Sequence, residues 1–501
     1  MDFPSRLEKI DRKLRNKWND EIEEFLGKPP SSSSDVIPLK EFEYDAVKAS
    51  LEAIALELQI ELTAYNTQDE TDTIDEYIGV AVRTGKNLLR WFIQIYLEQR
   101  RGRRESGCTI DVLRSTDILS SIVGILKWSV DDTKENTKLA RDSSLFIFYA
   151  TFAQFPGDEI ASKGINHLIS ELAFPSLSLE ILMNTNSVAL ALTLVRNLHS
   201  MAVSFPGAKK VILATQIQWD PSTAIKSAPW APGEPSTVNL SLSCLELMKW
   251  SLDAPSSFPD IYPEDKRAEL VIEILNLFYA LRKGQELVGT TTNNSALANA
   301  VVRILRLPFP VQTNDENDSE NNNDIVVKRI EQCKLSAISI LMDSDASFGE
   351  YMLEIGSLDA LLQIFQRQVD SIVDNTRVDS AATAAIVPIL AVLNKYSMAN
   401  SDVQQQVKAF VFPSETEKLY QQAVKENRKT KMSPVDAPKD SLRGKLVMLL
   451  SWVDGYIKRC SAELMWTLCN SDYSEYTCRV GMGNALTLLN AKGLSPVQIP
   501  T

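Results

Sequence analysis

The sequence contains few of the residues on which catalysis and metal binding most often depend. Its 501 residues include only two histidines, His167 and His199, and neither belongs to an H-E-x-x-H motif. No G-x-x-x-x-G-K-[ST] or G-x-S-x-G motif occurs. The G-M-G-N segment that begins at Gly481 starts like a dinucleotide-binding fingerprint, but Leu486 takes the place of its last glycine. We therefore expect a protein that is not an enzyme, with no metal and no cofactor.

Paired cysteines and long apolar runs are also missing. The six cysteines are scattered and form no C-x-x-C pair, which is typical of reduced thiols in a cytosolic protein. The N-terminus has no apolar signal core, and Asp2 stands where myristoylation requires glycine. The longest nearly apolar run, residues 381–393, is interrupted by Pro388 and is shorter than the ~20 residues of a membrane span. These features predict a cytoplasmic location, with the cell cortex as a further site, and membrane contact only through a partner.

Composition indicates a folded, helical and acidic protein. Apolar residues make up 44% and charged residues 23% of the chain, and no stretch alternates in the way a half-buried strand does. A chain of 501 residues exceeds one core of ordinary size, so several domains or a solenoid are expected. The formal net charge of −13 would repel phosphate backbones, so we expect no binding to nucleic acid.

Breaks in the helical pattern divide the chain into three parts. Residues 1–40 read as an N-terminal helix followed by a Pro/Ser linker, and residues 496–501 read as a short tail. Between them, residues 41–495 carry apolar helical periodicity, interrupted by predicted loops at 217–237 and 308–324. The first loop contains four prolines and two tryptophans, and buried indoles could hold it in order. Helices are predicted at about 41–66, 75–100, 109–128, 133–154, 158–172, 186–204, 238–252, 264–285, 295–306, 325–343, 346–355, 357–374, 379–398, 401–411 and 414–426.

A recurring asparagine inside apolar helices favours a repeat architecture. Asn197, Asn276 and Asn394 each follow a short apolar run, a pattern that looks like the third helix of armadillo repeats. At ~40–47 residues per repeat, residues 41–495 would hold about ten repeats. Stacked repeats bury a continuous core that one repeat alone could not bury. We therefore predict an all-α, armadillo/HEAT-like, right-handed superhelical solenoid with a concave binding trough.

Six residues are candidates for contacts with a partner in that trough, and each has a structural alternative. The amides of Asn197, Asn276 and Asn394 either bond a neighbouring helix or form a ladder that bonds a partner's main chain. Arg90 interrupts an apolar stretch, as a snorkelling rim residue or as a cation ready for a carboxylate. Lys458 and Arg459 either belong to a solvated helix face or line the trough.

The segment from Leu442 to Leu494 carries a resemblance to a known family. It contains L-R-x-K-L-V-x-L, then K-R-x-x-A-E-x-x-x-x-L-C, then V-G-M-G-N-A-x-x-L-L-x-A-x-G-L, in that order. Residues 268–281 and 296–307 carry a fainter form of the same likeness. This pattern resembles the end of the folded core of the synembryn family, whose members are chaperones and nucleotide-exchange factors for heterotrimeric G-protein α subunits.

The resemblance implies a specific partner and mode of action. A monomer would bind the C-terminal helix of a G-protein α subunit in the concave trough, loosen the bound GDP and stabilise the nucleotide-free state. The same affinity for an incompletely packed client would make it a folding chaperone. The alternative is a generic armadillo/HEAT scaffold or transport adaptor that binds a peptide segment.

Overall fold

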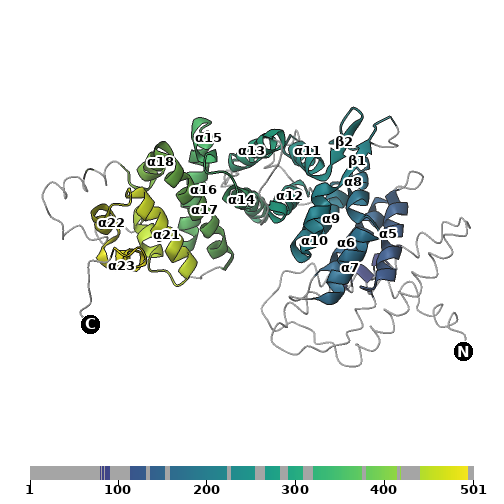
Figure 1. Cartoon of the computed structure of the whole chain (residues 1–501), viewed down its shortest axis with the longest axis horizontal. Helices are drawn as coiled ribbons and strands as arrows, with labels where there is room; N and C mark the ends of the chain where they lie inside the picture. The colour runs from purple at the N-terminus through teal and green to yellow at the C-terminus, as the bar shows by residue number, and fades with distance from the viewer. Residues whose placement is uncertain are drawn as a thin grey trace, which may run out of the picture. The chain divides into compact units, whose positions relative to one another are not determined.

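Helices form nearly all of the regular structure that the computed structural model describes (Figure 1). The structure describes residues 79, 82, 83, 85–87, 89, 90, 113–130, 136–152, 158–222, 227–253, 266–282, 291–308, 320–374, 380–413, 418 and 440–494. The predicted helix and linker at 1–40, the predicted tail at 496–501 and most of the predicted loop at 308–324 lie outside these residues. The last part of that loop is helical, because a helix begins at Glu320.

The chain divides into two compact units, Met1–Glu286 and Leu287–Thr501. In each unit, long helices from successive segments lie against one another, as stacked helical repeats require. The prediction of an all-α solenoid is confirmed at this level. The right-handed superhelix and the trough along residues 41–495 stay predictions.

The first unit is built around three long helices, α6, α9 and α12, with α9 packed between the other two. α5 and α7 cover α6, α10 packs on α9 and α7, and α11 packs on α8 and α12. The bounds are α5 Thr116–Val130, α6 Thr137–Thr151, α7 Glu159–Ser170, α8 Phe174–Asn184, α9 Val188–Ser204, α10 Pro206–Ala214, α11 Leu240–Asp253 and α12 Arg267–Arg282. Fully buried apolar side chains such as Leu119, Phe146, Leu194 and Ile274 form the core between them.

A small hairpin occupies the ends of the predicted loop at 217–237. β1 (Gln216–Trp219) pairs antiparallel with β2 (Ser236–Asn239), so the loop is shorter than predicted. The prediction that its indoles are buried is confirmed, since Trp219 and Trp230 are 6% and 4% exposed. Trp219 donates its indole N–H to the carbonyl of Pro232 at 3.0 Å, and Trp230 donates to that of Leu182 at 2.9 Å. The first bond joins β1 to the loop, and the second fastens the loop to α8.

The second unit repeats the arrangement with α14, α17 and α21, in which α17 lies between α14 and α21. α13 packs on α14, α16 on α17 and α20, α18 on α17 and α21, and α23 on α21 and α22. The bounds are α13 Thr291–Leu305, α14 Glu320–Met342, α15 Phe348–Glu354, α16 Leu358–Asp374, α17 Ser380–Ala399, α18 Ser401–Val411, α20 Leu442–Leu449, α21 Gly455–Leu468, α22 Tyr473–Val480 and α23 Met482–Ala491.

The segment that carries the family resemblance, Leu442–Leu494, folds into the helices α20, α21, α22 and α23. Asp454 caps α21 by accepting hydrogen bonds from the backbone N–H groups of Tyr456 and Ile457. Gly493 ends α23 with a φ of +70°, a conformation that glycine adopts without steric cost. Val453 is apolar but 98% exposed, because α20 already ends at Leu449.

Candidate functional site

The six predicted contact residues lie on the long helices of the two units. In the first unit, Arg90 belongs to the described helical residues before α5, Asn197 lies on α9 and Asn276 lies on α12. In the second unit, Asn394 lies on α17, and Lys458 and Arg459 lie on α21. Their surroundings differ, so each group is described within its own unit.

Asn197 is fully buried and bonds a neighbouring helix. Its Nδ2 donates to the carbonyl of Ser144 at 2.8 Å, to the Ser144 hydroxyl at 3.0 Å and to the carbonyl of Thr193 at 3.0 Å. Ser144 lies on α6, so this amide links α9 to α6. Of the two alternatives for this asparagine, the structure supports the interhelical bond, and Asn197 does not line an open surface.

A row of polar side chains crosses α6, α9 and α12 above that buried amide. Arg196 on α9 donates from Nε to Glu273 at 3.2 Å and from Nη2 to Glu269 at 3.3 Å, both on α12. His199 Nδ1 lies 3.2 Å from the other oxygen of Glu273. We call Arg90, Tyr149, Arg196, His199, Glu269 and Glu273 the α9 polar row.

Electrostatics link the two ends of the α9 polar row. Burial raises the pKa of the Tyr149 phenol on α6, and the charges of Arg90 and Arg196 act in the opposite direction. Burial alone would raise the pKa of Glu273, but hydrogen bonds and charges from His199 and Arg196 outweigh it and hold the pKa below its ordinary value. Glu273 therefore stays ionised near neutral pH, and Arg90 is a half-buried cation whose charge acts on Tyr149.

Sequence reasoning overlooked most of this row. It singled out the stretch around Asn197 for its asparagine, although Arg196 and His199 sit three positions apart and so share one helix face. Asn276 lies one turn beyond Glu273, is half-buried, and makes no side-chain hydrogen bond within the ranges the structure describes. It is therefore available to a partner, as Asn197 is not.

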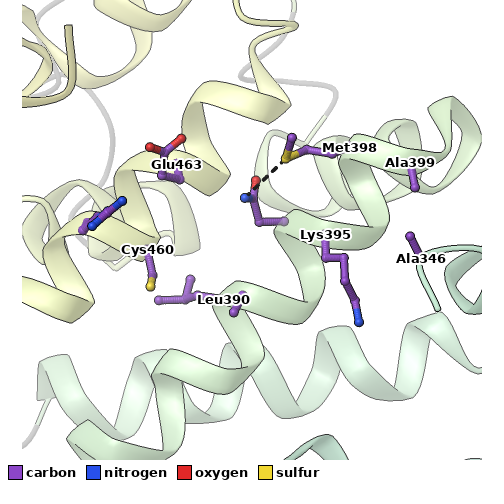
Figure 2. A pocket seen from close by; sticks show the side chains of 10 residues that line it. Ala346, Leu390, Lys395, Met398, Ala399, Cys460 and Glu463 are labelled. Atoms are coloured by element: carbon purple, nitrogen blue, oxygen red, sulfur yellow. Dashed lines mark hydrogen bonds between the residues drawn. The ribbon is translucent and has the colours of Figure 1, made fainter. Parts of the chain in front are cut away.

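In the second unit, α17 and α21 border a cleft of about 460 Å³ (Figure 2). Small and flexible apolar side chains form much of its wall: Ala346, Leu390, Ala391, Met398 and Ala399. Its polar groups come from both helices: Asn394, Lys395, Arg459, Cys460 and Glu463. We call this feature the α17–α21 cleft. It brings Asn394 and Arg459 together, whereas Lys458 is half-buried and does not line it.

Asn394 uses one end of its amide for the fold and presents the other to the cleft. Its Oδ1 accepts a 2.7 Å hydrogen bond from the hydroxyl of Thr467 on α21. Its Nδ2 contacts only the sulfur of Met398, at 3.6 Å, and a thioether is a weak acceptor. Both alternatives proposed for this asparagine therefore describe part of its environment.

The charged groups of the cleft are unequally engaged. Lys395 donates to the carbonyls of Leu341, Met342 and Ser344 at 2.8, 3.1 and 2.7 Å, which caps the end of α14. Burial lowers the pKa of Lys395, while Asp343 and Asp345 act the other way. On the opposite wall, Arg459 is exposed.

The described residues show neither a cluster of metal ligands nor an activated thiol in the cleft. Within the described part of the chain, no three His, Cys, Asp or Glu residues gather as metal ligands would. Burial, as the largest cause, raises the pKa of the Cys460 thiol in the cleft, which disfavours the nucleophilic thiolate. None of the described helices is both long and apolar enough to cross a membrane.

Comparison with known proteins identifies a family. Residues 249–498 match the family model described as guanine nucleotide exchange factor synembryn. Curated relatives include the proteins named chaperone Ric-8A from Xenopus laevis, 25% identical over 232 residues, and from Gallus gallus, 24% identical over 232 residues. Each match covers 46% of this chain and 39% of the relative, so the match spans well under half of those proteins.

Two solved structures share a general likeness. An engineered protein aligns over 98% of this chain and 93% of its own length, with a TM-score of 0.44 and 12% identity. A structure titled for the phosphorylation switch between cadherin and beta-catenin aligns over 99% of this chain and 96% of its own length, with a TM-score of 0.25 and 11% identity. At these TM-scores neither likeness supports an argument about this chain.

Proposed function

Because the chain belongs, over residues 249–498, to the synembryn family, we propose that it is a nucleotide-exchange factor and folding chaperone for heterotrimeric G-protein α subunits. The family match is the observation that carries this proposal. Stacked helices with open polar and apolar faces are compatible with it, since such stacks commonly provide extended binding surfaces. In this proposal the chain makes and breaks no covalent bond.

Exchange by such a protein is a matter of differential binding. The exchanger must bind the nucleotide-free α subunit more tightly than the GDP-bound form, and a shift from 1:99 to 99:1 requires about 5.5 kcal/mol of preference. We propose that the client's C-terminal helix, held against the long helices, supplies this preference by leaving its place beside the nucleotide. The same binding would stabilise an incompletely packed client by mass action and so serve a chaperone.

The α9 polar row supports a contact with that helix in the first unit. Arg196 is committed to Glu269 and Glu273, so it braces α9 against α12. Arg90 and Asn276 contribute a half-buried cation and a half-buried amide to the same unit. They could serve a carboxylate and a main-chain group of the client helix, respectively.

The location and assembly of the protein follow from the same proposal. We infer a monomer in the cytoplasm and at the cell cortex that reaches the membrane only through its client. The acidic net charge is compatible with this inference, because an anionic chain has little attraction to anionic lipid surfaces.

The experiment that tests the proposal is a pull-down with purified α subunits, followed by measurement of GDP release. We expect the chain to retain an α subunit, to lose it when the client's last residues are deleted, and to accelerate GDP release. Equal retention of the truncated client would contradict helix binding, and unchanged GDP release would contradict exchange.

A charge reversal tests the surface in the first unit. Arg90→Glu is expected to weaken client binding, whereas Lys138→Glu is expected to leave it unchanged. Lys138 is exposed at the start of α6 and provides a matched control for the change in charge. Equal affinities of the two variants, with both folded, would remove Arg90 from the contact.

A further inference from the structure

The α17–α21 cleft has an apolar wall that the fold leaves open. Met398 is 72% exposed, a large value for an apolar side chain beside a cleft. The cleft has a volume of about 460 Å³, within the range typical of ligand pockets, ~300–1,000 Å³, so it can accept several apolar atoms. Methionine is flexible and polarisable and adapts to varied apolar partners. This wall is therefore suited to the side chain of another protein segment.

The charged side chains that line the cleft are Lys395, Arg459 and Glu463. Glu463 is paired with Lys492 at 2.9 Å, so its charge is already balanced. Lys395 donates hydrogen bonds to the carbonyls at the end of α14. Arg459 is exposed and has no ion-pair or hydrogen-bond partner anywhere in the ranges described above. In a chain of net charge −13, this cation favours a carboxylate from a partner.

A hydrogen-bond donor lies between the apolar wall and that cation. Asn394 Nδ2 has only the Met398 sulfur as an acceptor, while its Oδ1 is held by Thr467. An amide fixed at one end can donate from the other end without losing much side-chain entropy. Figure 2 shows Met398 and Lys395 on one side of the cleft and Cys460 and Glu463 on the other.

We propose that the α17–α21 cleft binds an acidic, amphipathic peptide segment of a partner protein. An apolar side chain of the segment packs against Met398 and Ala399, a neighbouring carboxylate pairs with Arg459, and a main-chain carbonyl accepts from Asn394 Nδ2. A basic segment would face Arg459 and Lys395 with like charge, which disfavours it. This site goes beyond the proposed function, because neither helix binding nor nucleotide exchange requires it.

The test selects peptides without presupposing the partner. A phage-displayed library of random short peptides is panned on the immobilised full chain and depleted on the Arg459→Glu/Met398→Ala double variant. We expect enriched peptides to combine Asp or Glu with a bulky apolar residue. No enrichment, or enrichment of peptides without acidic residues, would overturn the proposal.

Affinities of one enriched peptide, synthesised with a fluorescent label, then assign the contacts. Arg459→Glu is expected to weaken binding by about tenfold or more, since an attractive pair becomes a repulsive one. Met398→Ala should weaken it by a few-fold through lost apolar contact. The controls Lys210→Glu and Met448→Ala alter an exposed lysine of the first unit and an exposed methionine outside the cleft, and neither should change the affinity. Equal losses in variants and controls would refute the site.

Alkylation of Cys460 provides an independent test of where the unlabelled peptide binds. It lines the cleft and is half-buried, so a bound peptide should slow its alkylation by a maleimide. The half-buried Cys478 on α22 lies outside the cleft lining and should react at an unchanged rate. Unchanged alkylation of Cys460 at saturating peptide would place the peptide elsewhere and overturn the proposal.

Discussion

Replacing Asn197 by alanine tests whether the asparagines of the long helices serve the fold or a partner. Asn197 is fully buried, and its Nδ2 bonds two acceptors of Ser144 on α6 and one of Thr193 on α9. Alanine removes the bridge between the helices and leaves a small cavity. The structure therefore predicts a loss of stability in the first unit, whether or not a partner is present.

The magnitude follows from the geometry. Each hydrogen bond of this kind contributes about 0.5–1.5 kcal/mol net, and two amide hydrogens can each make one good bond. The cavity increases the destabilisation by about 1 kcal/mol. Removal of the buried Oδ1, which has no hydrogen-bond partner among the described residues, decreases the destabilisation by a similar amount. We expect Asn197→Ala to lower the free energy of unfolding by about 2 kcal/mol.

The other two asparagines provide the comparison. Asn394 is half-buried and bonds Thr467, so Asn394→Ala should cost about 1 kcal/mol. Asn276 makes no side-chain bond among the described residues, and Asn276→Ala should stay within about 0.5 kcal/mol of wild type. Hydrogen exchange of peptides from α6, α9, α12 and α17 measures each loss in its own unit. If Asn276→Ala costs as much as Asn197→Ala, the interhelical interpretation of Asn197 is refuted.

Three further substitutions test packing and electrostatics. Gly349→Ala would place its Cβ 2.6 Å from the Cβ of buried Tyr396, so thermal unfolding should show a loss of about 1–3 kcal/mol. Gly483→Ala meets no atom within 4 Å and should be stabilising by about 0.5–1 kcal/mol; the opposite order would contradict the packing. Glu273→Gln should destabilise the chain at neutral pH, because the pKa of Glu273 is lowered by folding. That deficit is full above the ordinary pKa of 4.5 and vanishes as pH falls through the lowered value, and a deficit that persists in acid would rule out this cause.

Periodicity predicted most of the described helices, and its failures have physical causes. α8 was missed because it is apolar around most of its circumference, so it lacks the polar face that marks an amphipathic helix. α10 was missed because Pro206-Gly207 reads as a break, yet proline at the first helical position starts a helix readily. Both errors come from features that only packing against α9 and α11 resolves.

The hairpin shows the same limit. β1 and β2 are each four residues long and flank a proline-rich loop, which is too short for alternation to be visible. The tryptophans were the usable signal, because a large indole in a loop needs both a buried surface and an acceptor for its N–H. They identified the loop as ordered but not its strands.

The candidate site was predictable only in part because its chemistry depends on residues far apart in the chain. Asn394 and Arg459 were chosen separately and line one cleft, while Met398 and Lys395 beside them were not chosen. Three asparagines in similar sequence contexts have three different environments, since the partners of Asn197 and Asn394 come from other helices and Asn276 bonds none of the described side chains. A single sequence shows which residues lie on long helices but not which of them a neighbouring helix covers.

The long helices pack in the same way in both units, but the surfaces that they present differ in chemistry. In the first unit, Arg196 joins two carboxylates of α12, which holds α9 and α12 in one arrangement. A surface braced in this way would favour one shape of a bound partner over others. In the second unit, the wall beside Arg459 is built from Met398 and small residues that can repack. The first surface is therefore expected to select one partner shape, and the second is expected to accept varied apolar side chains.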